Sequence, residues 1–315
     1  MSYRRTKEEV EEALRDHDYL RAVGGFATQH LFVSIYSSST VVRTPETVLR
    51  GRWGAAGNDA FAGEEFLLNY RTDNARLGFQ MGIGRFYEPD AVLASCHANL
   101  DEDLRDAVEL PAAKPIRAGL TAVVTERRST RAFSGEAISM ADLSALLFHC
   151  QGNTGILHHG DPDDPQGVIR LRTVASGGGL YPVTLYIHAF NVAGLAPGAY
   201  RYLPYAHALS PVAPHSKLFP AQVLRSMDLD VERSGFVMTF VYDLYDNSRK
   251  YGDGGLVFGL IEVGGILQNL HLARTALGLA GCDQGGYDKQ MIEKMLDLDG
   301  LTSQVVHVTV VGREE

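Results

Sequence analysis

One long apolar segment limits the folds that this chain can adopt. Between residues 256 and 279, leucine and valine recur at spacings of four and three, which is the pattern of a helix with one apolar side. Strand patterns rich in β-branched and aromatic residues lie before and after it, at residues 183–190, 236–242 and 305–311. Gly264, Gly265 and Gly278 each weaken such a helix by about 1 kcal/mol relative to alanine. We therefore expect close packing at these glycines, against a partner helix, a cofactor or the core of the same subunit.

Two shorter helix patterns precede the first of these strands. Residues 118–128 have a helical pattern. Ser139 and Asp142 offer a start that resembles a capping box, for a helix that runs to about Cys150 and stops at Gly152. Helix and strand patterns thus alternate through the C-terminal two thirds of the chain.

A break separates this part from the N-terminal region. The segment LPAAKP, residues 110–115, carries two prolines, which interrupt regular structure. We place a domain boundary there. Residues 1–115 form the N-terminal region, which the family resemblance described below implies is variable, and residues 116–315 form one unit without internal repeats.

Composition excludes several classes of function. The 315 residues include 38 acidic and 29 basic side chains, and a formal charge of −9 disfavours nucleic-acid binding. The three cysteines, Cys96, Cys150 and Cys282, form no CxxC pair, which fits a reducing compartment. The charged N-terminus has no apolar signal region, and no window approaches 18 uninterrupted apolar residues. We expect a cytoplasmic protein that does not bind a membrane.

The first motif that carries chemistry is a cluster of arginines. Arg127, Arg128 and Arg131 bring three guanidinium groups beside the hydroxyl of Ser129. Guanidinium forks bind phosphate oxygens in bidentate fashion and stabilise other anionic edges. A solvated helix end is the alternative interpretation of the same pattern.

Two glycine-rich segments follow. Residues 175–182, ASGGGLYP, lead directly into a strand pattern, and their three glycines let the backbone approach a planar ligand. The spacing is neither that of a dinucleotide-binding fingerprint nor that of a Walker loop. Residues 283–288, DQGGYD, offer glycine backbone again. Taken alone, each segment is equally consistent with a plain flexible turn.

The pair Lys250–Tyr251 stands just before the long helix pattern. An ammonium beside a phenol favours the phenolate and lowers the tyrosine pKa, which makes the tyrosine usable as a general base. Adjacent lysine and tyrosine also occur by chance. The eleven histidines include no HExxH pair, so we expect no metal site, and the absence of GxSxG disfavours a hydrolase.

Taken in order, six motifs resemble those of one family. They are RRSTRAF, ASGGGLYPVTLYIH, GAYRYLPYAHAL, SRKYG, LIEVGGILQNLHLARTALGLAG and GGYDKQMIEKMLDLDG. The family is the SagB-type dehydrogenase branch of the nitroreductase-like flavoproteins, the oxidase subunits of thiazole/oxazole-forming peptide maturases. The resemblance covers about residues 116–313. It implies an α+β fold with a central, mainly antiparallel sheet flanked by helices, and a homodimer with two flavin mononucleotide (FMN) sites at the subunit interface.

The resemblance also assigns roles to the motifs. Arg127, Ser129 and Arg131 match positions for the FMN phosphate, ribityl chain and N1–C2=O edge, and Arg128 matches the variable position between them. Two glycine segments match the backbone at the pyrimidine side of the ring and near N5. Their residues are Ser176, Gly177, Gly178 and Gly179 in the first segment, and Gly285 and Gly286 in the second. Ala175 departs from the family, which usually has proline there.

Lys250 and Tyr251 match the Lys-Tyr pair of azoline oxidases, which generic nitroreductases lack. The resemblance therefore implies an FMN-dependent enzyme that oxidises peptide thiazolines or oxazolines made by a separate cyclodehydratase, with Tyr251 as base and oxygen as the final electron acceptor. The N-terminal region is expected to contact the cyclodehydratase or the peptide. Two alternatives stay open: an NAD(P)H-dependent nitroreductase or flavin reductase, and a non-catalytic scaffold of a maturase complex.

Overall fold

The computed structural model describes residues 63, 66–67, 70, 83–84, 102–158, 163, 168–212, 223–224 and 229–315. The chain divides into two compact units, Met1–Ala75 and Arg76–Glu315. The second unit contains every site residue that the sequence predicts. Most of the N-terminal region, with its expected contacts to other proteins, lies outside the described residues, and the division after residue 115 stays a prediction.

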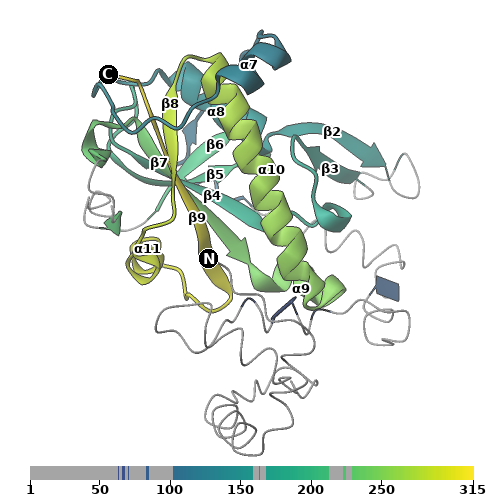
Figure 1. Cartoon of the computed structure of the whole chain (residues 1–315). Coiled ribbons are helices and arrows are strands. Elements are labelled where there is room, and N and C mark those ends of the chain that lie inside the picture. Colours follow the sequence, from purple (N-terminus) through teal and green to yellow (C-terminus); the bar gives the residue numbers. More distant parts are fainter. Residues whose placement is uncertain are drawn as a thin grey trace, which may run out of the picture. The chain divides into compact units, whose positions relative to one another are not determined.

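A seven-stranded antiparallel sheet forms the centre of the second unit (Figure 1). Its strand order is β1-β6-β5-β4-β7-β9-β8. The bounds are Val108–Glu109 (β1), Val183–Ala189 (β4), Gly198–Leu203 (β5), Ala208–Pro211 (β6), Phe236–Asp243 (β7), Ala280–Gln284 (β8) and Ser303–Gly312 (β9). The three strand patterns of the sequence therefore become β4, β7 and β9, which are neighbours in the sheet.

Helices cover both faces of this sheet. The helices are α7 (Leu120–Glu126), α8 (Met140–Gln151), α9 (Leu244–Tyr251), α10 (Gly254–Ala276) and α11 (Lys289–Met295). Leu146 of α8 and Leu270 of α10 belong to one core cluster, whereas Ile292 of α11 belongs to another. Residues 236–242 of β7 are all buried, as expected for a strand that is covered on both faces. This confirms the predicted α+β fold with an antiparallel sheet flanked by helices.

The predicted helix ends have clear causes. The Ser139 hydroxyl accepts a hydrogen bond from the Asp142 N–H at 3.0 Å and begins α8, which ends before Gly152. The first helix, α7, is shorter than predicted because the backbone of Arg127 is extended. This turn directs the rest of the arginine segment away from the helix.

A two-stranded hairpin, β2 (Asn153–His158) and β3 (Val168–Arg172), lies outside the main sheet (Figure 1). Arg172, the last residue of β3, holds the end of the hairpin that is joined to the rest of the fold. The Arg172 guanidinium carbon lies 4.5 Å from the ring centre of Tyr181 and 4.8 Å from that of Tyr205. Cation–π contacts of this kind hold the hairpin next to the segment that leads into β4.

The longest helix in the described part of the chain, α10, is long and apolar enough to cross a membrane by length and composition alone. One side of the helix packs against α8, α9 and the sheet, and 39% of its apolar span is buried. Packing within the subunit explains two of its glycines. A Cβ at Gly259 would lie 2.4 Å from the Tyr242 ring, and one at Gly265 would lie 3.0 Å from Val174. Gly264 meets no atom within 4 Å and faces open space.

Candidate functional site

The glycine segment before β4 forms a short 3-10 turn at Gly177–Gly179. Gly178 and Gly179 both have φ of 68°, a left-handed conformation that favours glycine. The backbone N–H of Tyr181 donates to the Ser176 hydroxyl at 2.9 Å and closes the turn. At Gly178 the space that a Cβ would take is filled by protein, because a Cβ there would lie 2.6 Å from a side-chain oxygen. The predicted approach of a planar ligand to this backbone stays a prediction.

That oxygen belongs to Tyr251. The ideal Cβ position at Gly178 is 2.6 Å from the Tyr251 hydroxyl and 2.8 Å from the Lys250 ammonium nitrogen. The structure thus brings together the loop and the Lys-Tyr pair, which are far apart in the sequence. Any side chain at residue 178 would displace the two side chains that the sequence singles out for catalysis.

Local structure fixes Lys250 and Tyr251 at the C-terminal end of α9. Asp243 caps this helix by accepting a hydrogen bond from the Tyr245 N–H at 3.2 Å. The Lys250 nitrogen lies 5.2 Å from the centre of the Tyr251 ring, which in turn meets the Phe258 ring edge to face at 4.9 Å. Phe258 belongs to α10, so two helices hold the phenol.

The arginine segment follows α7 and lies along β8. The Thr130 N–H donates to the Gly281 carbonyl at 3.0 Å. Arg127 is half-buried, whereas Arg128, Ser129 and Arg131 are exposed. These exposed groups have the donors that an anion requires.

Arg128 differs from its neighbours in the segment. Its guanidinium donates to the carbonyls of Thr125 and Arg127, each at 2.8 Å. It therefore caps the end of its own helix.

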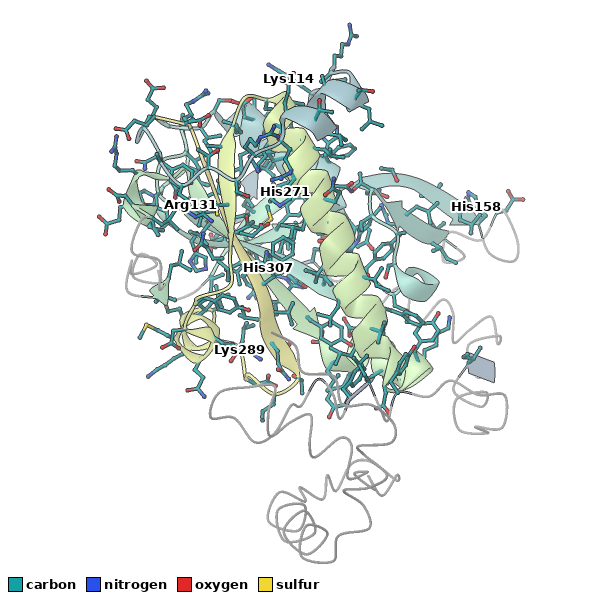
Figure 2. All side chains as sticks on the ribbon, viewed as in Figure 1. Lys114, Arg131, His158, His271, Lys289 and His307 are labelled. Atoms are coloured by element: carbon teal, nitrogen blue, oxygen red, sulfur yellow. The ribbon has the colours of Figure 1, made fainter. Side chains whose placement is uncertain are left out.

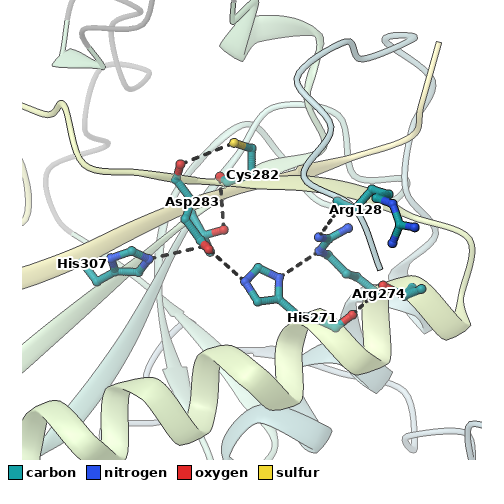
Figure 3. Close-up of polar contacts among 8 residues, drawn as sticks. Arg128, His271, Arg274, Cys282, Asp283 and His307 are labelled. Atoms are coloured by element: carbon teal, nitrogen blue, oxygen red, sulfur yellow. Dashed lines mark hydrogen bonds and ion pairs between the residues drawn. The ribbon is translucent and has the colours of Figure 1, made fainter. Parts of the chain in front are cut away.

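A chain of polar side chains joins this segment to β8 (Figure 3). Arg274, which is buried on α10, donates to the Arg128 carbonyl at 2.8 Å and to His271 Nδ1 at 3.1 Å. His271 Nε2 lies 2.9 Å from an oxygen of Asp283, and His307 Nε2 lies 3.4 Å from the other oxygen. Because Arg274 donates to Nδ1, the His271 proton resides on Nε2 and the ring donates it to Asp283.

This series of contacting side chains keeps the Asp283 carboxyl ionised. Burial raises the pKa of the Asp283 carboxyl, but the hydrogen bond from His271 and the nearby imidazole of His307 outweigh burial and hold the pKa well below its usual range. Asp283 precedes Gln284 in β8, and Gly285 and Gly286 follow at the exposed end of that strand. A Cβ at Gly285 would meet nothing within 4 Å. The second glycine segment is therefore open, with an anchored carboxylate behind it.

The described residues thus form two groups along α10. The first contains the Ser176–Gly179 loop with Lys250 and Tyr251, beside the N-terminal half of the helix. The second contains the arginine segment and the end of β8, beside His271 and Arg274 near the C-terminal end (Figure 2). The exposed guanidinium groups and the open glycine pair offer donors to an anionic ligand. Within the described ranges, no group of three or more histidine, cysteine, aspartate or glutamate side chains is arranged so that it could hold a metal ion.

Comparison with known proteins decides the family. A model of the nitroreductase family matches residues 124–313. The chain belongs to the nitroreductase family. The match begins just before the arginine segment and ends after β9, so it includes both groups of site residues.

The chain is similar to several known proteins. A protein of Methanocaldococcus jannaschii assigned as a nitroreductase is 26% identical over 191 residues, which are 61% of this chain and 89% of that protein. A crystal structure from Ralstonia eutropha, also assigned as a nitroreductase, is 19% identical with a TM-score of 0.51 and covers 66% of this chain and 90% of its own. A structure of the E. coli microcin synthetase McbBCD complex with truncated pro-MccB17 bound is 21% identical, covers 80% and 86%, and has a TM-score of 0.46.

Sequence reasoning missed Glu262, His271, Arg274, Asp283 and His307 as members of the site region. The two histidines are far apart in the sequence and match no ligand spacing. Asp283 was visible only as the first residue of a glycine turn. The one usable signal was charge inside an apolar helix, because Glu262 and Arg274 interrupt the most apolar segment of the chain.

Proposed function

We propose that this member of the nitroreductase family binds FMN and oxidises thiazolines or oxazolines in a peptide to thiazoles or oxazoles. The observation that carries the proposal is the contact of Lys250 and Tyr251 with Gly178. It brings a general-base candidate and a cation to the same loop that is proposed to lie against the flavin ring. The family match alone supports an oxidoreductase and leaves the substrate open.

The proposed FMN contacts divide between the two groups of residues. Arg127, Ser129 and Arg131 would bind the phosphate, the ribityl chain and the N1–C2=O edge, with Arg128 as the capping residue between them. The pyrimidine side of the ring would meet Ser176, Gly177, Gly178 and Gly179, and the backbone of Gly285 and Gly286 would lie near N5. Bound FMN would supply the hydride acceptor.

The protein's part in the reaction is proton removal and positioning. Tyr251 would take the α-proton of the azoline ring as the hydride leaves the neighbouring carbon. Lys250, with its nitrogen 5.2 Å from the centre of the Tyr251 ring, would stabilise the phenolate that this requires. Phe258 packs edge to face on the Tyr251 ring and would hold the ring while the proton moves.

A homodimer is proposed from the exposed apolar side chains. Leu120 and Val124 of α7 and Leu260 and Ile261 of α10 are between 49% and 69% exposed. A cavity of about 350 Å³ opens between α7, α8 and α10, and none of its lining residues is a predicted site residue. A second copy of the chain would cover this apolar surface. We further propose a cytoplasmic enzyme that acts after a cyclodehydratase in a maturase complex.

Purified protein tests the proposal directly. We expect a yellow protein that releases FMN on heating. Given an azoline peptide prepared with a cyclodehydratase, it should remove one molecule of hydrogen per ring, as measured by mass spectrometry. Protein that is colourless and cannot be loaded with FMN would contradict the cofactor assignment.

A nitroreductase or flavin reductase is the second candidate, because the M. jannaschii and R. eutropha proteins are assigned as nitroreductases. It predicts that NAD(P)H rapidly bleaches the bound flavin. Fast bleaching together with no azoline oxidation would favour it over the azoline oxidase.

A further inference from the structure

The segment that contains the glycine loop runs along α10 and α9 in regular steps. Going along this segment from residue 174 to residue 178, each contacting residue in turn meets a helix residue with a lower number than the one before. The pairs are Val174 with Gly265, Ser176 with Glu262, Gly177 with Phe258, and Gly178 with Lys250 and Tyr251. Three of these contacts are steric, and the contact of Ser176 is with a carboxyl group.

That carboxyl group is the most unusual in the described part of the chain. Glu262 is 2% exposed, and neither of its oxygens has a hydrogen-bond partner. The Ser176 hydroxyl and the Val183 N–H are near enough to lower its pKa, but neither meets the geometry of a hydrogen bond to it. A buried carboxylate without satisfied hydrogen bonds is costly, so the neutral acid is the favoured form at this position.

The exit of the same loop is strained. Tyr181 has φ of 48°, a left-handed conformation that is rare for a side chain of this size. Three contacts hold it there. Its N–H donates to the Ser176 hydroxyl, its own hydroxyl accepts from the Arg172 N–H at 3.0 Å, and the Arg172 guanidinium lies over its ring.

Charged and titratable groups face Glu262 from each neighbouring element. They are Arg172 of β3, Tyr181 after the loop, Tyr242 of β7 and Asp246 of α9. Burial raises the pKa of Glu262 to about 7, and Ser176 and Arg172 lower it only in part. Burial also raises the pKa of Asp246, to about 6. Arg172 is the one cation among these groups, and its guanidinium already contacts two tyrosine rings.

We infer that Glu262 is a positioning residue: its neutral, protonated carboxyl supports Ser176, and this support holds the strained loop so that Gly178 stays against Lys250 and Tyr251. The inference rests on the proposed function only for the catalytic meaning of those two side chains. The proton on Glu262 is then a structural component of the site, although Glu262 itself touches no reacting atom.

Ionisation of Glu262 has a defined consequence. The new carboxylate attracts Arg172, and a guanidinium that moves toward it gives up its contacts with Tyr181. Tyr181 then loses part of what holds its left-handed backbone. The loop loosens, and Gly178 loses its fixed place beside the Lys-Tyr pair.

Hydrogen–deuterium exchange of residues 174–182 in the full chain tests this without any ligand. Rates are corrected for the intrinsic pH dependence of amide exchange. We expect exchange in this segment to rise by about tenfold from about pH 6 to about pH 8, in proportion to the ionised fraction. Glu262→Gln keeps the shape without the charge, and should give the same slow exchange at both pH values.

Two further variants make the test specific. Glu293→Gln alters another buried glutamate, on α11, and should keep the wild-type pH dependence. Ser176→Ala removes the supported hydroxyl and should give fast exchange at both pH values. A Glu262→Gln protein that keeps the wild-type pH dependence, or a Ser176→Ala protein that does so, would overturn the inference.

Binding of FMN provides a second readout. If the loop must be ordered to bind, the wild-type FMN affinity falls about tenfold over the same pH interval, whereas that of Glu262→Gln stays constant. Wild-type protein that never binds FMN while exchange follows Glu262 would reject the proposed function and retain the positioning role. Failure of the proposed FMN-dependent function and failure of the positioning role of Glu262 therefore give different results.

Discussion

Two carboxyl groups, one on α10 and one facing it from β8, meet opposite environments. Glu262 is almost fully buried with no hydrogen-bond partner, and burial raises its pKa to about 7. The Asp283 side chain is 37% exposed and two histidines face it, so its pKa lies well below the usual range. A neutral acid therefore lies in the first half of α10, and a fixed anion contacts the helix near its end. The comparison shows that partners, more than position along the helix, decide the charge of each group.

The largest expected effect concerns the region of Glu262, where the proposed base lies. Tyr251→Phe should lower the rate of azoline oxidation by about 10²–10⁴, because the proton acceptor is lost while the ring remains. Lys250→Ala should act in the same direction. Both variants should keep FMN. Tyr245→Phe, on the exposed side of α9, is the matched control and should have wild-type rates. Wild-type oxidation by Tyr251→Phe would reject the assigned base.

The next effect concerns the region of Asp283, to which the arginine segment is tied. Arg131→Ala should weaken FMN binding by about 1.5–3 kcal/mol, the usual cost of removing a charged donor. Arg128→Ala should change it far less, because that guanidinium caps its own helix. Flavin fluorescence titration measures both. Equal losses in the two variants would show that only the net charge of the segment matters.

The pH dependence of stability sharpens the contrast between the acids. Glu262 has a raised folded-state pKa, so its favourable contribution is complete below the unfolded value near 4.5 and is lost as the pH rises through about 7. The free energy of unfolding of the wild type should fall by about 2 kcal/mol between about pH 5 and about pH 8 relative to Glu262→Gln. Denaturant unfolding at each pH measures this. Parallel curves for the two proteins would contradict it.

Asp283 should show the opposite sign. Its folded-state pKa is lowered, so its contribution is present above the unfolded value near 3.8 and is lost as the pH falls through the folded value. Asp283→Asn should lower the free energy of unfolding by about 1.5 kcal/mol at neutral pH, a figure reduced for partial exposure. The difference should shrink in strong acid. Asp253→Asn, whose side chain caps no helix, serves as the control.

The smallest effect tests the helix that both regions share. Gly264→Ala should stabilise the isolated chain by about 1 kcal/mol, because open space receives the methyl group and alanine favours the helix. Gly259→Ala should instead destabilise it, since Tyr242 occupies the space. Thermal unfolding separates the two. If Gly264→Ala loosens a dimer, as seen by sedimentation, Gly264 lies at the subunit interface.

The sequence predicted the central elements of the fold because their patterns depend on burial. β4, β7 and β9 lie close to the ranges predicted, and α10 begins and ends within a few residues of the predicted helix. The end of α7 was wrong by a few residues, since the extended backbone of Arg127 reflects tertiary packing of the following segment on β8. Terminal positions of helices are the least determined by local pattern.

The candidate site was predictable motif by motif but not as an arrangement. The Lys-Tyr pair and the glycine loop were both visible in the sequence, yet their contact depends on how α9 and the loop meet across the fold. The contacts that link Arg274 to Asp283 depend on three elements that meet only in the folded protein: α10, β8 and β9. Pairings of distant polar groups leave no periodic trace in a sequence.

The hydrogen bond from Thr130 to Gly281 has a consequence for solubility. β8 is an edge strand of the sheet, and unpaired edge strands recruit strands from other molecules into aggregates. The arginine segment lies along this edge and occupies one of its carbonyl groups, and β1 at the opposite edge is only two residues long. A substitution that detaches the arginine segment from β8 would therefore expose an aggregation-prone edge strand. It would also remove the proposed anion site. Loss of cofactor and the onset of aggregation are expected to occur together in such variants.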